Sequence, residues 1–177
     1  KTFIAARICM HFFSVYPDSK VYITAAPPLE NLKQILWGEI MSIIRKRPTL
    51  VNDCRVKSLM IVRSPQNFLA GVAIPTSGTS AEREAKFSGK HAPNMLFVVD
   101  EGDAVPDEVY RGIESCMSGG TTIRLLIMFN PRAKIGPVYQ KEYYKQANVV
   151  ELSAFDHPNV VTGRNIIPGA VTRETTI

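Results

Sequence analysis

Two apolar stretches constrain the fold of this chain more than any other feature of its sequence. Residues 95–99 are all apolar, and residues 123–129 form a second apolar segment that contains one arginine. Strands of this composition have to be covered on both faces, as happens in a parallel sheet that lies between layers of helices. The two stretches therefore predict an α/β protein.

Helical and β-rich patterns alternate along the rest of the chain, as this fold class requires. Apolar residues at helical spacing predict helices over 3–15, 29–47, 105–117 and 136–146. Short β-rich segments predict further strands at 20–26, 60–63, 72–75 and 149–152. The polar segment 76–92, rich in glycine, serine and charge, predicts an exposed loop. We expect a mostly parallel sheet with helices on both faces.

The composition limits the kind of protein. The 177 residues are 45% apolar and 21% charged, which is typical of one folded globular domain. No apolar run is long enough to cross a bilayer. The formal net charge of +5 permits a polyanionic partner without establishing one. The basic run at 45–47 is explained by its place in the last turn of a predicted helix, with a DNA contact as the alternative.

The cysteines favour a chain without disulfides. Cys9, Cys54 and Cys116 are odd in number, far apart and not at metal-ligand spacing. We expect buried thiols in a reducing compartment rather than a disulfide or a zinc site.

Polar residues follow both apolar stretches at the point where each predicted strand ends. Asp100 and Glu101 follow the first stretch, and Asn130 follows the second. In a parallel sheet these positions share one edge, where ligands bind. One carboxylate can hold Mg²⁺, the other can polarise an attacking water, and Asn130 can orient that water or a phosphate. The pattern predicts a site for phosphoryl transfer.

Other polar residues around this strand have simpler explanations. Asp103, Asp107 and Glu108 suit the start of a helix behind Pro106, because acids are favourable in a first turn. We interpret His91 as a residue of the surface or one that anchors a loop.

A phosphate-binding loop is the part that such a site still needs. Lys1 and Thr2 fit the last two positions of the motif G-x-x-x-x-G-K-[ST], which opens a helix. The glycines of that motif are absent from the chain, so Lys-Thr alone does not identify it.

Several segments together resemble a known family. They are KT with the following helix, VYITAAPPLENLKQILWGEI, FSGKHAPNMLFVVDE and LLIMFNPR. They resemble the ATPase motor domain of phage terminase large subunits, which package DNA into viral proheads. The resemblance extends from Lys1 to about Gly169. It implies a P-loop NTPase fold of the RecA-like (ASCE) type, with ATP and Mg²⁺ as cofactors.

The resemblance also implies a role for each matching residue. Lys1 would bind the β and γ phosphates of ATP, and Thr2 would bind Mg²⁺. Asp100 would assist in holding Mg²⁺, and Glu101 would be the general base. Asn130 would link the state of the γ-phosphate to domain movement.

The chain departs from the family pattern in its missing parts. The glycine-rich loop and the strand before it are absent, and in this family that strand lies between those resembled by 123–129 and 149–152. We expect a piece of a longer protein that lacks the first strand and most of the P-loop. Residues 1–158 would be a partial ATPase domain, and 159–177 a loop or linker toward an absent nuclease domain. We expect the piece itself to be weak or inactive as an ATPase.

An arginine finger is a further expectation of the resemblance, since these motors often carry an arginine ahead of the glycine before the Asp-Glu strand. Arg83 is the candidate, and a solvated loop charge is the other explanation for it. Arg124 and Arg132 are alternatives of lower weight.

The resemblance implies partners and a setting as well. Double-stranded DNA, the portal, the small terminase subunit and a homo-oligomeric ring are expected, in the cytoplasm of a host cell and without a membrane. Two other functions stay open: a lobe of a DExD-type helicase, and a non-catalytic nucleotide-fold module that binds a partner by its basic surface. Helicases usually have Ser-Ala-Thr where this chain has residues 129–131, and they need a second motor lobe.

Overall fold

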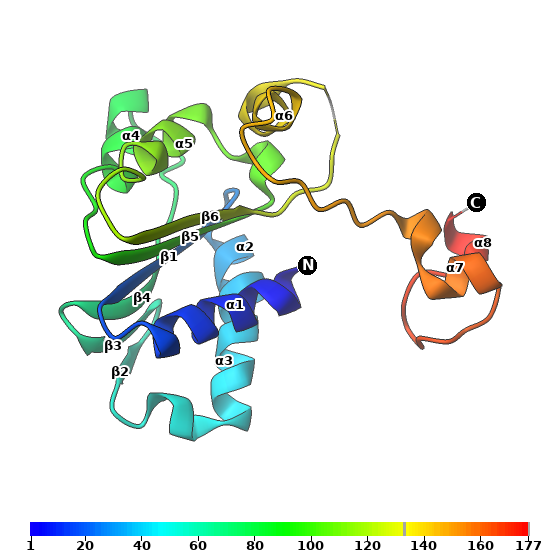
Figure 1. The fold of residues 1–177 in the computed structure, drawn as a ribbon, viewed down its shortest axis with the longest axis horizontal. Helices are drawn as coiled ribbons and strands as arrows, with labels where there is room; N and C mark the ends of the chain where they lie inside the picture. Colours follow the sequence, from blue (N-terminus) through cyan, green and yellow to red (C-terminus); the bar gives the residue numbers. More distant parts are fainter. Residues whose placement is uncertain (133, 177) are drawn as a thin grey trace. The chain divides into compact units, whose positions relative to one another are not determined.

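The computed structural model describes residues 1–132 and 134–176, and its centre is a six-stranded sheet (Figure 1). The strand order is β2-β3-β4-β1-β5-β6. The sheet is parallel across β4, β1, β5 and β6. Beside β4, the pairs β4–β3 and β3–β2 are antiparallel. The strands are β1 (Ser19–Ala25), β2 (Arg55–Lys57), β3 (Met60–Ser64), β4 (Asn67–Gly71), β5 (Asn94–Asp100) and β6 (Thr122–Ile127). The prediction of a mostly parallel sheet is confirmed.

Helices cover both faces of this sheet, as predicted. Figure 1 shows α1 (Thr2–Val15) and α3 (Trp37–Lys46) on one face, and α4 (Ser80–Phe87) and α5 (Asp107–Glu114) on the other. The short helix α2 (Leu29–Asn31) and a π-helical stretch (Leu32–Leu36) lead into α3. Single 3-10 turns occupy Pro48–Val51, Gly102–Ala104 and Ala154–Asp156.

The apolar strand β5 faces two cores at once. Leu96 and Val98 belong to the core beneath α1 and α3. Met95, Phe97 and Val99 belong to the core beneath α4 and α5. None of the five is more than 3% exposed. Burial on both faces explains why this strand has no polar residue before Asp100.

The predicted loop at 76–92 is wrong in its middle, where α4 forms. Thr79 caps the helix: its Oγ1 accepts a hydrogen bond from the Glu82 amide at 3.2 Å, and Glu82 Oε2 accepts one from the Thr79 amide at 2.7 Å. This reciprocal pair satisfies amide groups that the first turn otherwise leaves unpaired. The helix also buries Phe87, which is 1% exposed.

The predicted strand at 149–152 is also wrong. These residues form no helix or strand, and Val149, Val150 and Leu152 are 53%, 82% and 65% exposed. A strand is stable only beside a partner, and β6 is the last strand on its side of the described sheet. The strand predicted at 72–75 is displaced, because β4 ends at Gly71. Beyond it, the Val72 amide bonds Ile23 O, and the Val72 carbonyl accepts a hydrogen bond from Thr24 Oγ1.

The cysteines are free, as predicted. Cys9 and Cys116 are buried, and burial raises the pKa of the Cys9 thiol to about 12. Cys54 is half-buried beside Asp53. Across residues 1–132 and 134–176, no helix is long and apolar enough to span a membrane.

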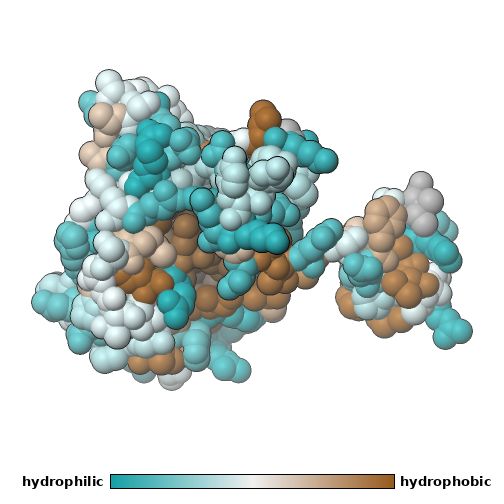
Figure 2. Space-filling view, turned by 45° about the horizontal axis from the view of Figure 1, so that its top comes forward, coloured by the Kyte–Doolittle hydropathy of each residue, from teal (hydrophilic) through white to brown (hydrophobic). Residues whose placement is uncertain are grey.

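The chain divides into two compact units, Lys1–Gln140 and Lys141–Ile177, and helix α6 (Gly136–Tyr143) crosses the division. The smaller unit contains α7 (Pro158–Thr162) and α8 (Arg173–Thr176). Asn159 closes it locally, since its side chain bonds both the amide and the carbonyl of Ile167, at 2.8 and 2.9 Å. Figure 2 shows hydrophobic side chains on the surface of this unit. The expected linker role of 159–177 stays a prediction.

Candidate functional site

The carboxyl ends of three parallel strands meet at one edge of the sheet and hold the predicted site residues. Backbone hydrogen bonds continue between neighbouring segments just beyond the ends of these strands. The Ala26 amide bonds Asp100 O at 3.2 Å, the Met128 amide bonds Val99 O at 2.8 Å, and the Gly102 amide bonds Met128 O at 2.9 Å. These bonds fix the segments that carry Asp100, Glu101 and Asn130 next to one another.

Helix α1 begins at the same edge and brings Lys1 and Thr2 to it. Lys1 Nζ donates hydrogen bonds to the carbonyl oxygen of Phe129 and to Asn130 Oδ1, the latter at 2.6 Å. Thr2 Oγ1 donates to Asp100 Oδ2 at 3.4 Å. The structure thus brings together Lys1, Thr2, Asp100 and Asn130, although two of these residues lie about a hundred positions or more along the chain from the other two.

Asp100 is the buried carboxylate of the group and is 5% exposed. Burial raises the pKa of Asp100, whereas the Glu101 amide, the Thr2 hydroxyl and the charge of Lys1 lower it. A buried carboxylate is ionised at lower cost when a cation lies beside it. The local electrostatics therefore favour a cation at this carboxylate.

The turn after β5 places Glu101 in an unusual backbone conformation. Its φ and ψ are 51° and 45°, in the left-handed region that non-glycine residues rarely adopt. Gly102 follows with no room for a side chain: a Cβ there would lie 2.5 Å from Ile127 Cγ2 and 2.8 Å from the Tyr110 hydroxyl. That hydroxyl donates to the Gly102 carbonyl at 2.6 Å. Packing against β6 and α5 therefore holds Glu101 in place.

Arg132 lies against the acidic residues of this turn. Its Nη2 is 3.5 Å from Glu101 Oε2, and its Nε is 3.1 Å from Asp103 Oδ2. Among the described residues, Glu101 Oε2 and Asp103 Oδ1 are buried atoms without a hydrogen-bond partner. Arg132 was the alternative of lower weight for an arginine at the site, and the structure places it beside the predicted general base.

Arg83 is engaged elsewhere. On α4, its Nε lies 2.6 Å from Glu108 Oε1 and its Nη1 donates to Gly78 O at 3.0 Å. The pKa of Glu108 is lowered by a hydrogen bond from the backbone amide of Glu108 and by the guanidinium of Arg83. In the part of the chain that the structure describes, no hydrogen bond or ion pair joins Arg83 to Asp100, Glu101 or Asn130. No local pattern of the sequence predicts the pair of Arg83 with Glu108.

The remaining sequence candidates are simpler. Arg124 is exposed on β6, and its Nη1 donates to the Ile123 carbonyl at 2.9 Å. The carbonyl of His91 accepts a hydrogen bond from Lys20, which agrees with a residue that anchors a loop. Asp107 pairs with Arg111 at 2.8 Å within the first turns of α5.

The donor set suits Mg²⁺ in part. A carboxylate and a hydroxyl are the oxygen ligands that this ion prefers, and Mg²⁺ usually takes its remaining ligands from water and substrate phosphate. Thr2 and Asp100 supply those two groups from the protein. Among the residues described, no group of three or more His, Cys, Asp or Glu side chains could hold a metal by itself.

Comparison with known proteins gives a match among solved structures. No family model matches the chain, and no curated protein does. Two solved structures to which it is similar are those of phage large terminases. For that of HK97 bacteriophage the identity is 13% and the TM-score 0.48, over 71% of this chain and 26% of that one. For that of a thermophilic bacteriophage the identity is 14% and the TM-score 0.48, over 73% and 30%. The chain spans less than a third of the length of either structure.

Proposed function

We propose that this chain is part of the ATP-hydrolysing motor of a viral DNA-packaging large terminase. The observation that supports this most is the meeting of Lys1, Thr2, Asp100 and Asn130 at one edge of the sheet. Each has the side chain that phosphoryl transfer needs at its position. The proposal implies three partners: double-stranded DNA, the portal and the small terminase subunit. It also implies a ring of copies of the protein in the host cytoplasm.

In the proposed mechanism, Lys1 binds the β and γ phosphates of ATP, while Thr2 and Asp100 hold Mg²⁺. When bound there, Mg²⁺ would supply positive charge to neutralise the phosphates. Glu101 accepts the proton of the attacking water. The left-handed turn fixes the backbone that carries Glu101, and a fixed backbone reduces the reorganisation needed for reaction.

The contacts of segment 129–132 suggest how the phosphate state is transmitted. In the structure, the ammonium of Lys1 bonds Phe129 and Asn130, while Arg132 pairs with Glu101. A phosphate that binds Lys1 competes for the ammonium and so releases Asn130. Arg132 is two residues after Asn130. A movement of Asn130 therefore also shifts Arg132 and alters its ion pair with Glu101. By this route, Asn130 would couple phosphate binding at Lys1 to the position of segment 129–132.

The test uses the full-length protein. Glu101→Gln should retain the binding of Mg²⁺-ATP and lose turnover, because the amide cannot accept the proton. Undiminished hydrolysis would remove Glu101 as the base. The upstream reading frame gives a second test, since it should encode a glycine-rich loop that ends in Lys1 and Thr2.

A further inference from the structure

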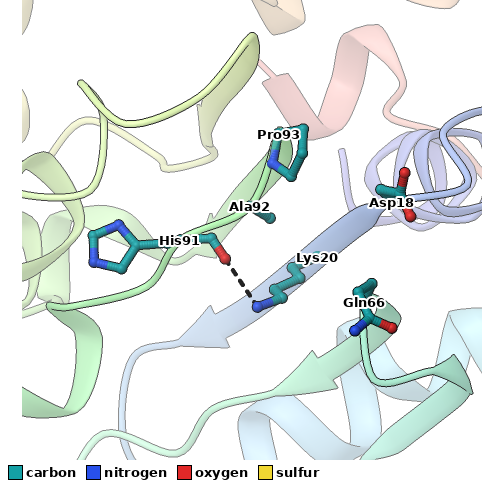
Figure 3. Close-up of a pocket in the computed structure, with 6 residues that line it drawn as sticks. All are labelled: Asp18, Lys20, Gln66, His91, Ala92 and Pro93. Atoms are coloured by element: carbon teal, nitrogen blue, oxygen red, sulfur yellow. Dashed lines mark hydrogen bonds between the residues drawn. The ribbon is translucent and has the colours of Figure 1, made fainter.

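The opposite edge of the sheet, at the amino ends of the strands, carries a pocket that the proposed ATPase site does not use. Its volume is 340 Å³, and Figure 3 shows its lining residues around the start of β1 and the loop before β5. They are Asp18, Lys20, Gln66, His91, Ala92 and Pro93.

Lys20 is held in place within this pocket. Its ammonium donates a hydrogen bond to the His91 carbonyl at 2.8 Å, drawn as a dashed line in Figure 3. It also lies 5.7 Å from the centre of the Phe68 ring. An ammonium group has three N–H donors, and among the described residues no second hydrogen bond joins the ammonium of Lys20, so two donors remain for a ligand. The side chain is therefore ordered in advance, which lowers the entropy cost of binding.

A second lysine, next to the pocket residue His91, is held in a similar way. Lys90 Nζ lies 4.9 Å from the centre of the Tyr22 ring, a cation–π distance. Tyr22 is fixed in turn, because it stacks on Phe97 at 5.3 Å and meets Phe68 edge-on at 5.6 Å. The ammonium groups of the half-buried Lys20 and Lys90 therefore lie against one cluster of aromatic rings.

The charges around Lys90 favour an anion. Burial lowers the pKa of Lys90, and the positive charges of Lys86 and Lys20 lower it further, whereas the Cys116 thiol raises it. Lys90 is repelled by both of these lysines, and an anion beside it would relieve that repulsion. Asp18 is the one carboxylate among the residues that line the pocket.

We propose that Lys20, Lys86 and Lys90 form a binding surface for the phosphate backbone of duplex DNA. Phosphate contacts of this kind position a protein on DNA and need no recognition of bases. Gln66 and His91 add polar groups at the pocket. The choice of DNA among polyanions rests on the proposed function, whereas the position of the surface rests on the contacts of the lysines.

The experiment measures binding of the 177-residue chain to a fluorescent DNA duplex across a series of salt concentrations, without nucleotide. Lys20→Gln combined with Lys90→Gln should weaken binding about tenfold or more and reduce the slope of log K against log salt by about 2. Asp18→Asn should strengthen binding, because it removes the opposing charge. Arg45→Gln combined with Lys46→Gln, at the end of α3, is the control with the same loss of charge and should leave most of the affinity.

Several results would overturn the proposal: an equal loss in the α3 control, an unchanged salt slope in the double variant, or tighter binding of polyglutamate than of DNA. If the double variant does not fold, the exposed Lys86→Gln replaces it and should lower the slope by about 1. Because no nucleotide is present, failure of the proposed ATPase would leave this result intact, and failure of DNA binding here would leave the ATPase test intact.

Discussion

Cationic side chains at the two ends of the parallel sheet have different kinds of interaction partner. At the carboxyl end, Lys1 bonds Asn130, and Arg132 pairs with Glu101 and Asp103. At the amino end, Lys20 and Lys90 rest on a carbonyl group and on aromatic rings. A ligand at the carboxyl end has to displace interactions between side chains, so its binding can move parts of the protein. A ligand at the amino end meets cations with donors to spare.

The largest effect is expected from removal of the carboxylate that we propose as the general base. In the full-length protein, Glu101→Gln should lower ATP turnover about 100-fold or more, the scale of general-base catalysis. Steady-state phosphate release measures turnover, and nucleotide binding measured in parallel should stay close to wild type. A loss of binding together with turnover would indicate that Glu101 acts in binding.

Gly102→Ala tests whether close packing holds the acidic turn. A methyl group there would overlap Ile127 and Tyr110, so the free energy of unfolding should fall by about 1–3 kcal/mol. Urea denaturation of the 177-residue chain gives the value. Gly38→Ala in α3 is the matched control, because its Cβ would meet an ordinary contact of 3.5 Å, with the carbonyl oxygen of Lys33. That variant should be unchanged or more stable by about 0.5–1 kcal/mol.

Arg83→Gln separates a structural arginine from an arginine finger. Because the pKa of Glu108 is lowered in the folded state, its ionised form stabilises the protein above the carboxyl's ordinary pKa, and this stability is lost as the pH falls through the lowered value. The variant should be less stable than wild type at pH 7, by less than Gly102→Ala, and the difference should shrink in acid. Urea denaturation at several pH values checks this. Stability equal to wild type at pH 7 would contradict a structural role.

Asp100→Asn should have the smallest effect on stability and the opposite sign. Burial raises the pKa of Asp100, so the folded protein loses stability as the pH rises from the ordinary carboxyl pKa through the raised value. Asparagine has no such cost, and the variant should be as stable as wild type or slightly more so at pH 7. Thermal unfolding at pH 7 measures the change. A marked loss of stability would show that the bond with Thr2 outweighs the cost of burial.

The sequence was sufficient for features that depend on one local signal. The apolar run before Asp100 required a strand buried on both faces, and parallel strands required Asp100 and Asn130 to share an edge. The helix over Ser80–Phe87 has a local signal as well, the Thr79–Glu82 pair, although the polar composition of 76–92 favours a loop.

Features that depend on distant partners were out of reach. The segment at 149–152 has the composition of a strand, yet whether it forms one depends on a neighbouring strand that its own residues do not supply. The pairs of Arg132 with Glu101 and of Arg83 with Glu108 depend on how loops and helices fold back across the sheet. Neither spacing nor residue type encodes such pairs.

The open side of β6 has a practical consequence for the isolated chain. Along Thr122–Ile127, backbone amides and carbonyls that face away from β5 are available to another strand, and Arg124 is the only charged side chain of β6. Uncovered edges of this kind template intermolecular β-sheet and aggregation. Self-association should therefore grow with protein concentration, and dilute solutions would help to keep the chain monomeric during the binding measurements.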